Sequence, residues 1–177
     1  MRVSRRVALL AAIVGMLLVA TAAPALAADT VEHCSTASCV DSTPLPGEVC
    51  IKSKKAVSAK VAYWASVCVW THSWSTLGFP YIDAHAEAGL TGSTQDFTQI
   101  DVLHVRLWRS HHGAAWTQEQ DATFSLTPGQ KNETGDTQVA CYDVWHAEID
   151  YIIRWKDGTW SQQKVYNSDD VDHVAGC

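Results

Sequence analysis

Residues 57–74, with the sequence VSAKVAYWASVCVWTHSW, decide the fold class of this chain. Their odd positions are apolar at the two-residue period of a pleated strand, which predicts a face that packs on the core. The even positions begin polar and then become Trp64, Cys68, Trp70 and Trp74, so we expect the second face to be covered as well. A strand buried on both faces lies in the middle of a sheet or between layers. The odd positions are Val57, Ala59, Val61, Tyr63, Ala65, Val67 and Val69.

Most of the chain after this stretch also has the pattern of strands separated by turns. We expect a short strand at 48–52, strands at 96–109, 137–155 and 159–166, and a more polar edge strand at 116–126. The connection at 75–94 is predicted to be a long loop with one short helical turn at 81–90. These elements predict an all-β fold, a disulfide-bonded antiparallel β-sandwich of about six to eight strands with an extended N-terminal arm.

Asp157-Gly158 carries the strongest hairpin signal in the sequence, because this dipeptide suits a two-residue turn. The hairpin predicts paired residue numbers that add to 315, with Trp155 opposite Trp160. Within 145–155 the residues Trp145, Ala147, Ile149, Tyr151, Ile153 and Trp155 should face the core, and His146, Glu148, Asp150 and Arg154 the other side.

Residues 1–27 have the three parts of a secretory signal peptide: a basic region, an apolar run and a small-residue cleavage site. We expect cleavage before Ala28 and a secreted, extracellular product. Removal of Arg2, Arg5 and Arg6 leaves 10 basic residues against 19 acidic ones, a formal charge of −9. This charge argues against nucleic acid or an anionic membrane surface as the main partner.

All six cysteines lie after the signal peptide, and an even count in an exported chain predicts three disulfides. Cys34 and Cys39 suit a local loop. The hairpin register brings Cys141 near Val174, which favours a Cys141–Cys177 bond and leaves Cys50–Cys68 as the third. A Cys68–Cys141 bond between sheets is the alternative.

Residues 28–47 differ from the rest of the chain, since they are rich in Ser and Thr and lack apolar periodicity. Pro44 and Pro46 disfavour a helix there. We therefore predict three parts: a signal peptide at 1–27, an extended arm with its own disulfide loop at 28–47, and a β-sandwich domain at 48–177. A disordered tail is the alternative for the arm.

Several groups of side chains contain residue types that are found in catalytic or metal sites. Asp83, His85 and Glu87 alternate and would supply metal ligands on an extended strand, but an exposed acidic loop is the simpler interpretation. Glu148 and Asp150 imitate a glycosidase pair, but a solvated sheet face explains them, and His111-His112 is interpreted as a solvated turn. We therefore expect no enzyme activity, no metal and no cofactor.

The eight tryptophans support two interpretations. Trp64, Trp70, Trp145, Trp155 and Trp160 lie in apolar rows and are expected in the core. Trp74, Trp108 and Trp116, at strand ends beside polar residues, are the candidates for an exposed platform.

The layout of a signal peptide, an arm with Cys34 and Cys39, and a disulfide-bonded β domain without a catalytic motif resembles the small secreted adaptor subunit of actinobacterial umbrella toxin particles. The resemblance implies an antibacterial toxin complex. In it, the arm would occupy a cleft in a lectin-like subunit with a trypsin-like domain, and the sandwich would meet the stalk of a large toxin.

An extended, disulfide-shaped arm suits insertion into a partner's groove, because its main-chain groups are free to hydrogen-bond. The sequence thus predicts a non-enzymatic protein–protein interaction module. The alternatives are a secreted protease inhibitor that uses the same arm and a carbohydrate-binding module that uses exposed tryptophans. The predicted partner-binding residues are Val31, His33, Cys34, Ser35, Thr36, Ala37, Ser38, Cys39, Pro44 and Pro46.

Overall fold

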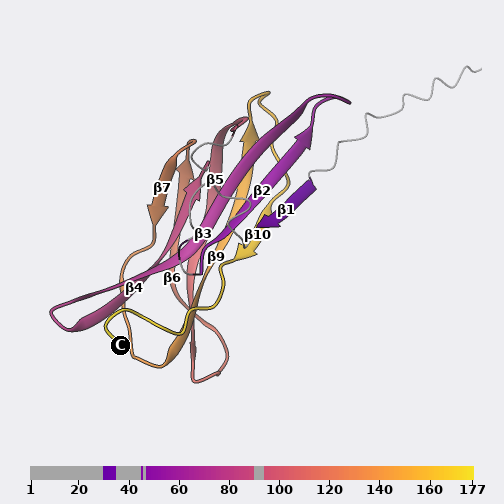
Figure 1. Ribbon diagram of the computed structural model, residues 1–177. Coiled ribbons are helices and arrows are strands. Elements are labelled where there is room, and N and C mark those ends of the chain that lie inside the picture. Colours follow the sequence, from indigo (N-terminus) through magenta and orange to yellow (C-terminus); the bar gives the residue numbers. More distant parts are fainter. Residues whose placement is uncertain (1–29, 35–44, 46, 90–93) are drawn as a thin grey trace, which may run out of the picture.

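The protein is an all-β sandwich of two antiparallel sheets (Figure 1). The computed structural model describes residues 45, 47–89 and 94–177, and the backbone of residues 30–34. Sheet A has the order β1 (Thr30–Cys34), β2 (Val49–Ala56), β3 (Ala62–Thr76), β4 (Phe79–Ala88) and β7 (Gln130–Glu133), with β8 (Thr137–Gln138) also paired to β4. Sheet B has the order β10 (Lys164–Asn167), β9 (Asp143–Trp155), β5 (Phe97–His111) and β6 (Thr117–Leu126). The predicted fold class is confirmed.

The core lies between the two sheets. From sheet A it takes the odd positions of β3, Ala65, Val67 and Val69, because alternate residues of a strand point to the same face. From sheet B it takes the predicted odd row of β9, which runs from Trp145 to Trp155. The inner faces of the two sheets supply nearly all of the large buried side chains. The outer faces are therefore not needed to build the core.

The predicted long strand at 57–74 begins later than expected. Residues 57–61 form the turn between β2 and β3, closed by hydrogen bonds from the Val57 and Ser58 amides to the Val61 carbonyl. Val57 and Val61 are therefore 44% and 50% exposed. Their alternation with polar residues imitates a strand, and no Gly or Pro marks this turn. Within the sheet β3 is central, as predicted.

The predicted loop at 75–94 is wrong, because its middle is the strand β4. Residues Leu77 and Gly78 both have positive φ, 52° and 80°, and turn the chain directly from β3 into β4. Ile82, Ala84 and Ala86 then pack on the core. The row of small alanines suits a helix as well as a strand, and only pairing with β3 selects the extended form.

A β-bulge explains the mixed pattern of β5. Its pairing with β6 shifts between Val102 and Val105, so the buried positions change from even, at Ile100 and Val102, to odd, at Val105 and Leu107. One extra residue reverses which side chains face the core. The predicted edge strand at 116–126 is β6, which is the edge of sheet B.

The hairpin after β9 has the predicted register only in part. β9 and β10 pair with residue numbers that add to 315, as in Lys164 with Tyr151. Near the turn, however, Trp160 pairs with Arg154 and not with Trp155. The Trp155 amide bonds to the Thr159 carbonyl, so the loop is longer than the two residues expected. The predicted strand 137–155 is divided into β8 and β9.

Two of the expected disulfides are present. Cys50–Cys68 joins directly paired residues of β2 and β3, and Cys141–Cys177 ties the C-terminus to the segment before β9. The alternative Cys68–Cys141 bond is thereby excluded. The Cys34–Cys39 pairing involves a residue outside those described, as does the whole signal peptide at 1–27.

The start of the predicted arm belongs to the sandwich. β1 pairs with β2 over five residues, from Thr30 opposite Lys54 to Cys34 opposite Cys50, and forms one edge of sheet A. The predicted boundary at 47/48 assigns residues 30–34 to the arm, and their pairing with β2 makes them a strand of sheet A as well. Polar side chains at Glu32 and His33 left no alternating apolar row from which to predict this strand.

Candidate functional site

The outer face of sheet A carries a row of aromatic side chains from two paired strands. Trp70, His72 and Trp74 of β3 lie opposite His85, Asp83 and Tyr81 of β4, respectively. Ring stacking continues along this row: Trp70 on His85 at 5.1 Å, His72 on Trp74 at 5.2 Å, and Trp74 on Tyr81 at 5.9 Å between centroids. The alternation of each strand places these side chains together.

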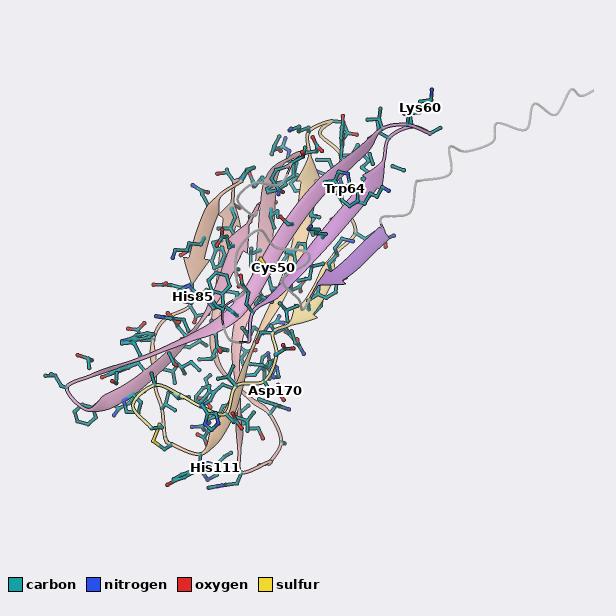
Figure 2. The ribbon with its side chains drawn as sticks, in the orientation of Figure 1. Cys50, Lys60, Trp64, His85, His111 and Asp170 are labelled. Carbon is teal, nitrogen blue, oxygen red and sulfur yellow. A yellow bond between two sulfur atoms is a disulfide. The ribbon has the colours of Figure 1, made fainter. Side chains whose placement is uncertain are left out.

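A polar cluster lies within this row, and we call it the His72–Asp83–His85 cluster. The Asp83 Oδ1 atom is 2.9 Å from His85 Nε2 and 3.7 Å from His72 Nδ1. From β7, Glu133 brings its Oε2 atom to 3.4 Å from His85 Nε2. Asp83 and His85 are only 2% and 6% exposed, whereas His72 and Glu133 are open to solvent. Figure 2 labels His85 within sheet A.

The prediction that Asp83 and His85 belong to an exposed acidic loop is therefore wrong. The extended strand was the condition under which the sequence allowed a metal site, and the structure meets that condition. The third member differs, however: His72, on the neighbouring strand, joins the cluster, and Glu87 does not. Pairing between β3 and β4 could not be predicted once 75–94 had been interpreted as a loop.

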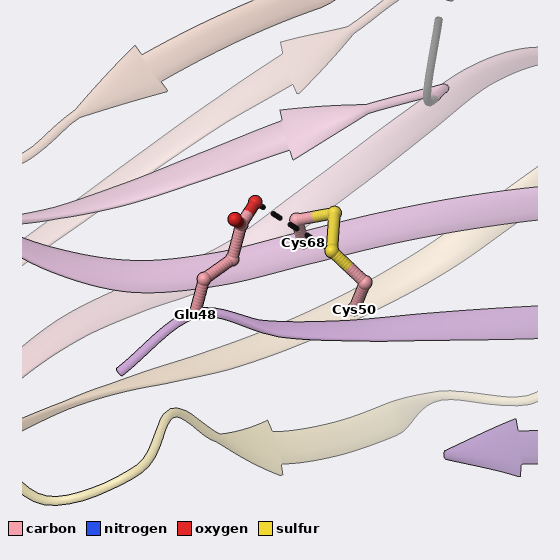
Figure 3. A group of neighbouring side chains, drawn as sticks. All are labelled: Glu48, Cys50 and Cys68. Carbon is pink, nitrogen blue, oxygen red and sulfur yellow. Dashed lines mark hydrogen bonds between the residues drawn. A yellow bond between two sulfur atoms is a disulfide. The ribbon is translucent and has the colours of Figure 1, made fainter. Parts of the chain in front are cut away.

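Glu87 lies instead beside the Cys50–Cys68 disulfide, opposite Cys68 in the register. Burial, with a further contribution from Glu48, raises the pKa of Glu87, and Lys131 partly offsets this. The Oε1 atom of Glu48 lies 3.5 Å from Cys50 Sγ. Figure 3 shows Glu48 beside the disulfide. Glu48, Cys50 and Cys68 lie close enough together to suggest a metal site. The two cysteines are bonded to each other, however, so neither has the free thiolate that would bind a metal ion.

The outer face of sheet B is occupied by charge pairs. Arg106 forms an ion pair with Glu148, and Gln163 Nε2 donates to Asp150 Oδ2 at 2.7 Å. Glu148 and Asp150 do share a face, as predicted, but Asp150 is buried and not solvated. Each of the two carboxylates is held by a neighbouring side chain.

One end of the sandwich gathers histidines with carboxylates. His111 Nδ1 lies 2.5 Å from Asp143 Oδ1, and His146 Nδ1 lies 3.2 Å from Asp170 Oδ1. Figure 2 labels His111 and Asp170 at this end. His111 is exposed, as predicted, but it is the last residue of β5, and the turn begins at His112. Trp116 packs on His146 at 4.2 Å between ring centroids, which fixes the orientation of that imidazole.

The tryptophans follow the prediction unevenly. Trp70, Trp145 and Trp155 are buried, Trp64 is half-buried, and Trp160 is 50% exposed, so its assignment to the core is wrong. The longer hairpin loop moves Trp160 out of the row that faces the core. Of the predicted exposed set, Trp116 is exposed, and Trp74 and Trp108 are half-buried.

The predicted partner-binding residues lie at one edge of sheet A or beyond the described chain. Val31, His33 and Cys34 belong to β1, whose pairing with β2 makes it the outermost strand (Figure 1). Ser35, Thr36, Ala37, Ser38, Cys39, Pro44 and Pro46 lie outside the described residues.

Comparison of the chain with protein-family models finds no match, and comparison with curated proteins finds none either. In the part of the chain that the structure describes, no helix is long and apolar enough to cross a membrane. The disulfides fit an oxidising compartment, because reducing conditions would remove them.

Proposed function

We propose that this protein is a secreted, non-enzymatic adaptor that binds another secreted protein through its N-terminal segment, residues 28–47. The observation that carries the proposal is the position of β1. This strand is the last one of sheet A, and the only strand with which it pairs among the described residues is β2. An edge strand offers main-chain donors and acceptors to an added strand, which is a common mode of protein recognition.

The rigidity of the sandwich supports this role. The Cys50–Cys68 disulfide lies on β2, the strand that carries β1, and ties it to β3 in the middle of the sheet. A segment that is held in place before binding loses less conformational entropy when the partner arrives. The same two-sheet body then presents further surfaces to a second partner.

The architecture also supports a place in an extracellular antibacterial toxin complex. There, by resemblance to the actinobacterial umbrella toxin adaptor, the partners are a lectin-like subunit with a trypsin-like domain and the stalk of a large toxin. The segment that follows β1 would fill the cleft of the first partner. The sandwich would meet the second.

The test is recovery of partners from culture supernatant with the intact purified chain, identified by mass spectrometry. Deleting 28–47 also strips β1 from β2, so a sharper variant keeps β1 and replaces Ser35, Thr36, Ala37 and Ser38 by glycine. A matched control replaces the turn residues Ser58 and Lys60, at the opposite end of β2, by glycine. We expect the control to recover the partner and the first variant to lose it; recovery of no protein by the intact chain would refute the proposal.

A carbohydrate-binding module remains the second candidate, favoured by the exposure of Trp116 and Trp160. If the protein has this function, it should bind chitin or cellulose, and the variant with glycine at 35–38 should still bind. Trp116→Ala or Trp160→Ala should abolish the binding. A protease inhibitor would instead block a secreted serine protease at stoichiometric amounts.

A further inference from the structure

The His72–Asp83–His85 cluster has the composition of a transition-metal site. Two imidazole nitrogens and one carboxylate come from directly neighbouring positions of β3 and β4, and Glu133 of β7 supplies a second carboxylate. Mixed nitrogen and oxygen ligands suit zinc, copper and nickel better than calcium or magnesium, which prefer oxygen alone. The ligand set of this cluster therefore indicates a divalent ion such as zinc, copper or nickel.

The distances between the candidate ligand atoms agree with one shared ion. Ligands that each lie about 2.0–2.2 Å from zinc are separated by roughly 3.3–3.6 Å when the angles at the metal are near tetrahedral. The observed separations are 2.9 Å for Asp83–His85, 3.4 Å for His85–Glu133 and 3.7 Å for His72–Asp83. The ligand atoms of His72, Asp83 and His85 all lie within 4.8 Å of one another, and Glu133 approaches this cluster at His85.

The buried members of the cluster lack hydrogen-bond partners. Both ring nitrogens of His85 and the Oδ1 atom of Asp83 are buried and make no hydrogen bond within the described part of the chain, although Nε2 and Oδ1 lie 2.9 Å apart. Their contact has the separation of a hydrogen bond without its geometry. Buried polar atoms are costly unless they are satisfied, and an ion between them would satisfy both.

The neighbouring rings hold the imidazoles in place. Trp70 stacks on His85 and Trp74 stacks on His72, with the two imidazoles edge to face at 5.3 Å. Fixed ligand orientation is a requirement of a site that binds without reorganisation. His72 and Glu133 remain exposed, so an ion can enter from solvent.

We propose that His72, Asp83 and His85, assisted by Glu133, bind one divalent transition-metal ion of the zinc and copper class on the outer face of sheet A. The ion would connect β3, β4 and β7 across the surface that the core does not use. This site is independent of the N-terminal segment and does not depend on the proposed adaptor role.

Zinc titration of the purified, tag-free chain, stripped of metal beforehand, tests the proposal by calorimetry. We expect one Zn²⁺ per chain and a higher melting temperature with zinc. Asp83→Asn and His72→Gln should each weaken binding by at least about tenfold. His72 is exposed, so His72→Gln keeps the fold even where Asp83→Asn disturbs it.

The matched controls are His104→Gln, which removes a histidine paired with Asp121 on sheet B, and His111→Gln at the end of the sandwich. Both should leave zinc affinity unchanged. With Co²⁺ in place of zinc, the visible absorption of the bound ion should appear in the wild type and disappear in His72→Gln. Absence of stoichiometric binding, affinity unchanged by both His72→Gln and Asp83→Asn, or loss in a control variant would overturn the proposal.

Discussion

Glu87 is a carboxyl group whose environment favours its neutral form. Burial and the nearby Glu48 raise its pKa above the ordinary value of 4.5. Such a group binds protons more tightly in the folded state, so its contribution to stability is fully present at acidic pH. That contribution is lost as the pH rises through the folded-state pKa.

Glu87→Gln should therefore raise the melting temperature at pH 7 and change it little at pH 4. Thermal unfolding of the variant and the wild type at both values measures this difference. A Glu119→Gln variant, on the far sheet, controls for the loss of one negative charge. A larger gain at pH 4 than at pH 7 would contradict the assignment.

Trp155 and Trp160 differ sharply in burial, at 0% and 50% exposed. Trp155→Ala should lower the free energy of unfolding by about 3–5 kcal/mol, because it leaves a cavity in the core. Trp160→Ala should cost about 1 kcal/mol or less, since it removes an exposed ring and its cation–π contact with Arg154. Urea denaturation compares the two, and equal costs would show that Trp160 is in the core after all.

For single residues, the alternation of apolar and polar positions predicted burial well inside long strands and poorly near turns. The row from Trp145 to Trp155 faces the core as expected, because pairing on both sides of β9 holds its register. Trp160 follows a loop whose length sets its direction, and the sequence indicated a shorter loop. Val57 and Val61 also alternate with polar residues, which predicted that they face the core, but they lie in a turn.

The β3–β4 hairpin contains a leucine in an unfavourable backbone conformation. Leu77 has a φ of 52° and is 94% exposed, so no packing compensates for the clash of its Cβ atom. Asparagine tolerates this region and is common before glycine in two-residue hairpin turns. Leu77→Asn should raise the free energy of unfolding by about 0.5–1 kcal/mol.

Leu77→Ala is the matched control for that prediction. It removes the same apolar surface and keeps a Cβ atom in the left-handed region, so it should give no such gain. Chemical denaturation of both variants measures the difference. A gain shared by alanine and asparagine would assign the effect to surface hydrophobicity and contradict the backbone explanation.

The elements that the sequence missed are those that depend on their neighbours. β4 has alanines on its core face and charges on its outer face, a pattern that becomes a strand only beside β3. The candidate metal cluster was missed for the same reason. The sequence shows the alternation of Asp83, His85 and Glu87, but His72 takes the place of Glu87 through strand pairing, which no local pattern indicates.

The C-terminal tail is held against the β3–β4 hairpin near its turn. The Cys141–Cys177 bond spans 36 residues, and the Ala175 amide donates to Ser73 Oγ at 3.1 Å. Replacing both cysteines by alanine should lower the free energy of unfolding by about 3–4 kcal/mol, as expected from the length of the closed loop. Thermal unfolding measures this cost, with Asp172→Ala on the exposed tail as a control, and an unchanged melting temperature would show that the bond adds no stability.

For the whole molecule, the succession of strand patterns and turns predicted the fold class, and the even number of cysteines predicted disulfides, of which two are present among the described residues. The division into arm and domain stays a prediction. β1 carries polar side chains and no apolar row, and it becomes part of the sheet through its backbone bonds to β2. Edge strands of this kind leave little trace in a sequence.

The central claim is that the N-terminal segment binds the partner. Hydrogen–deuterium exchange of the chain, alone and in complex with the partner recovered from supernatant, tests it most directly. Bound to the partner, the amides of residues 30–47 should exchange more slowly, while those of β6 and the 111–116 turn should be unchanged. Protection confined to the 111–116 turn, with 30–47 unaffected, would contradict the claim.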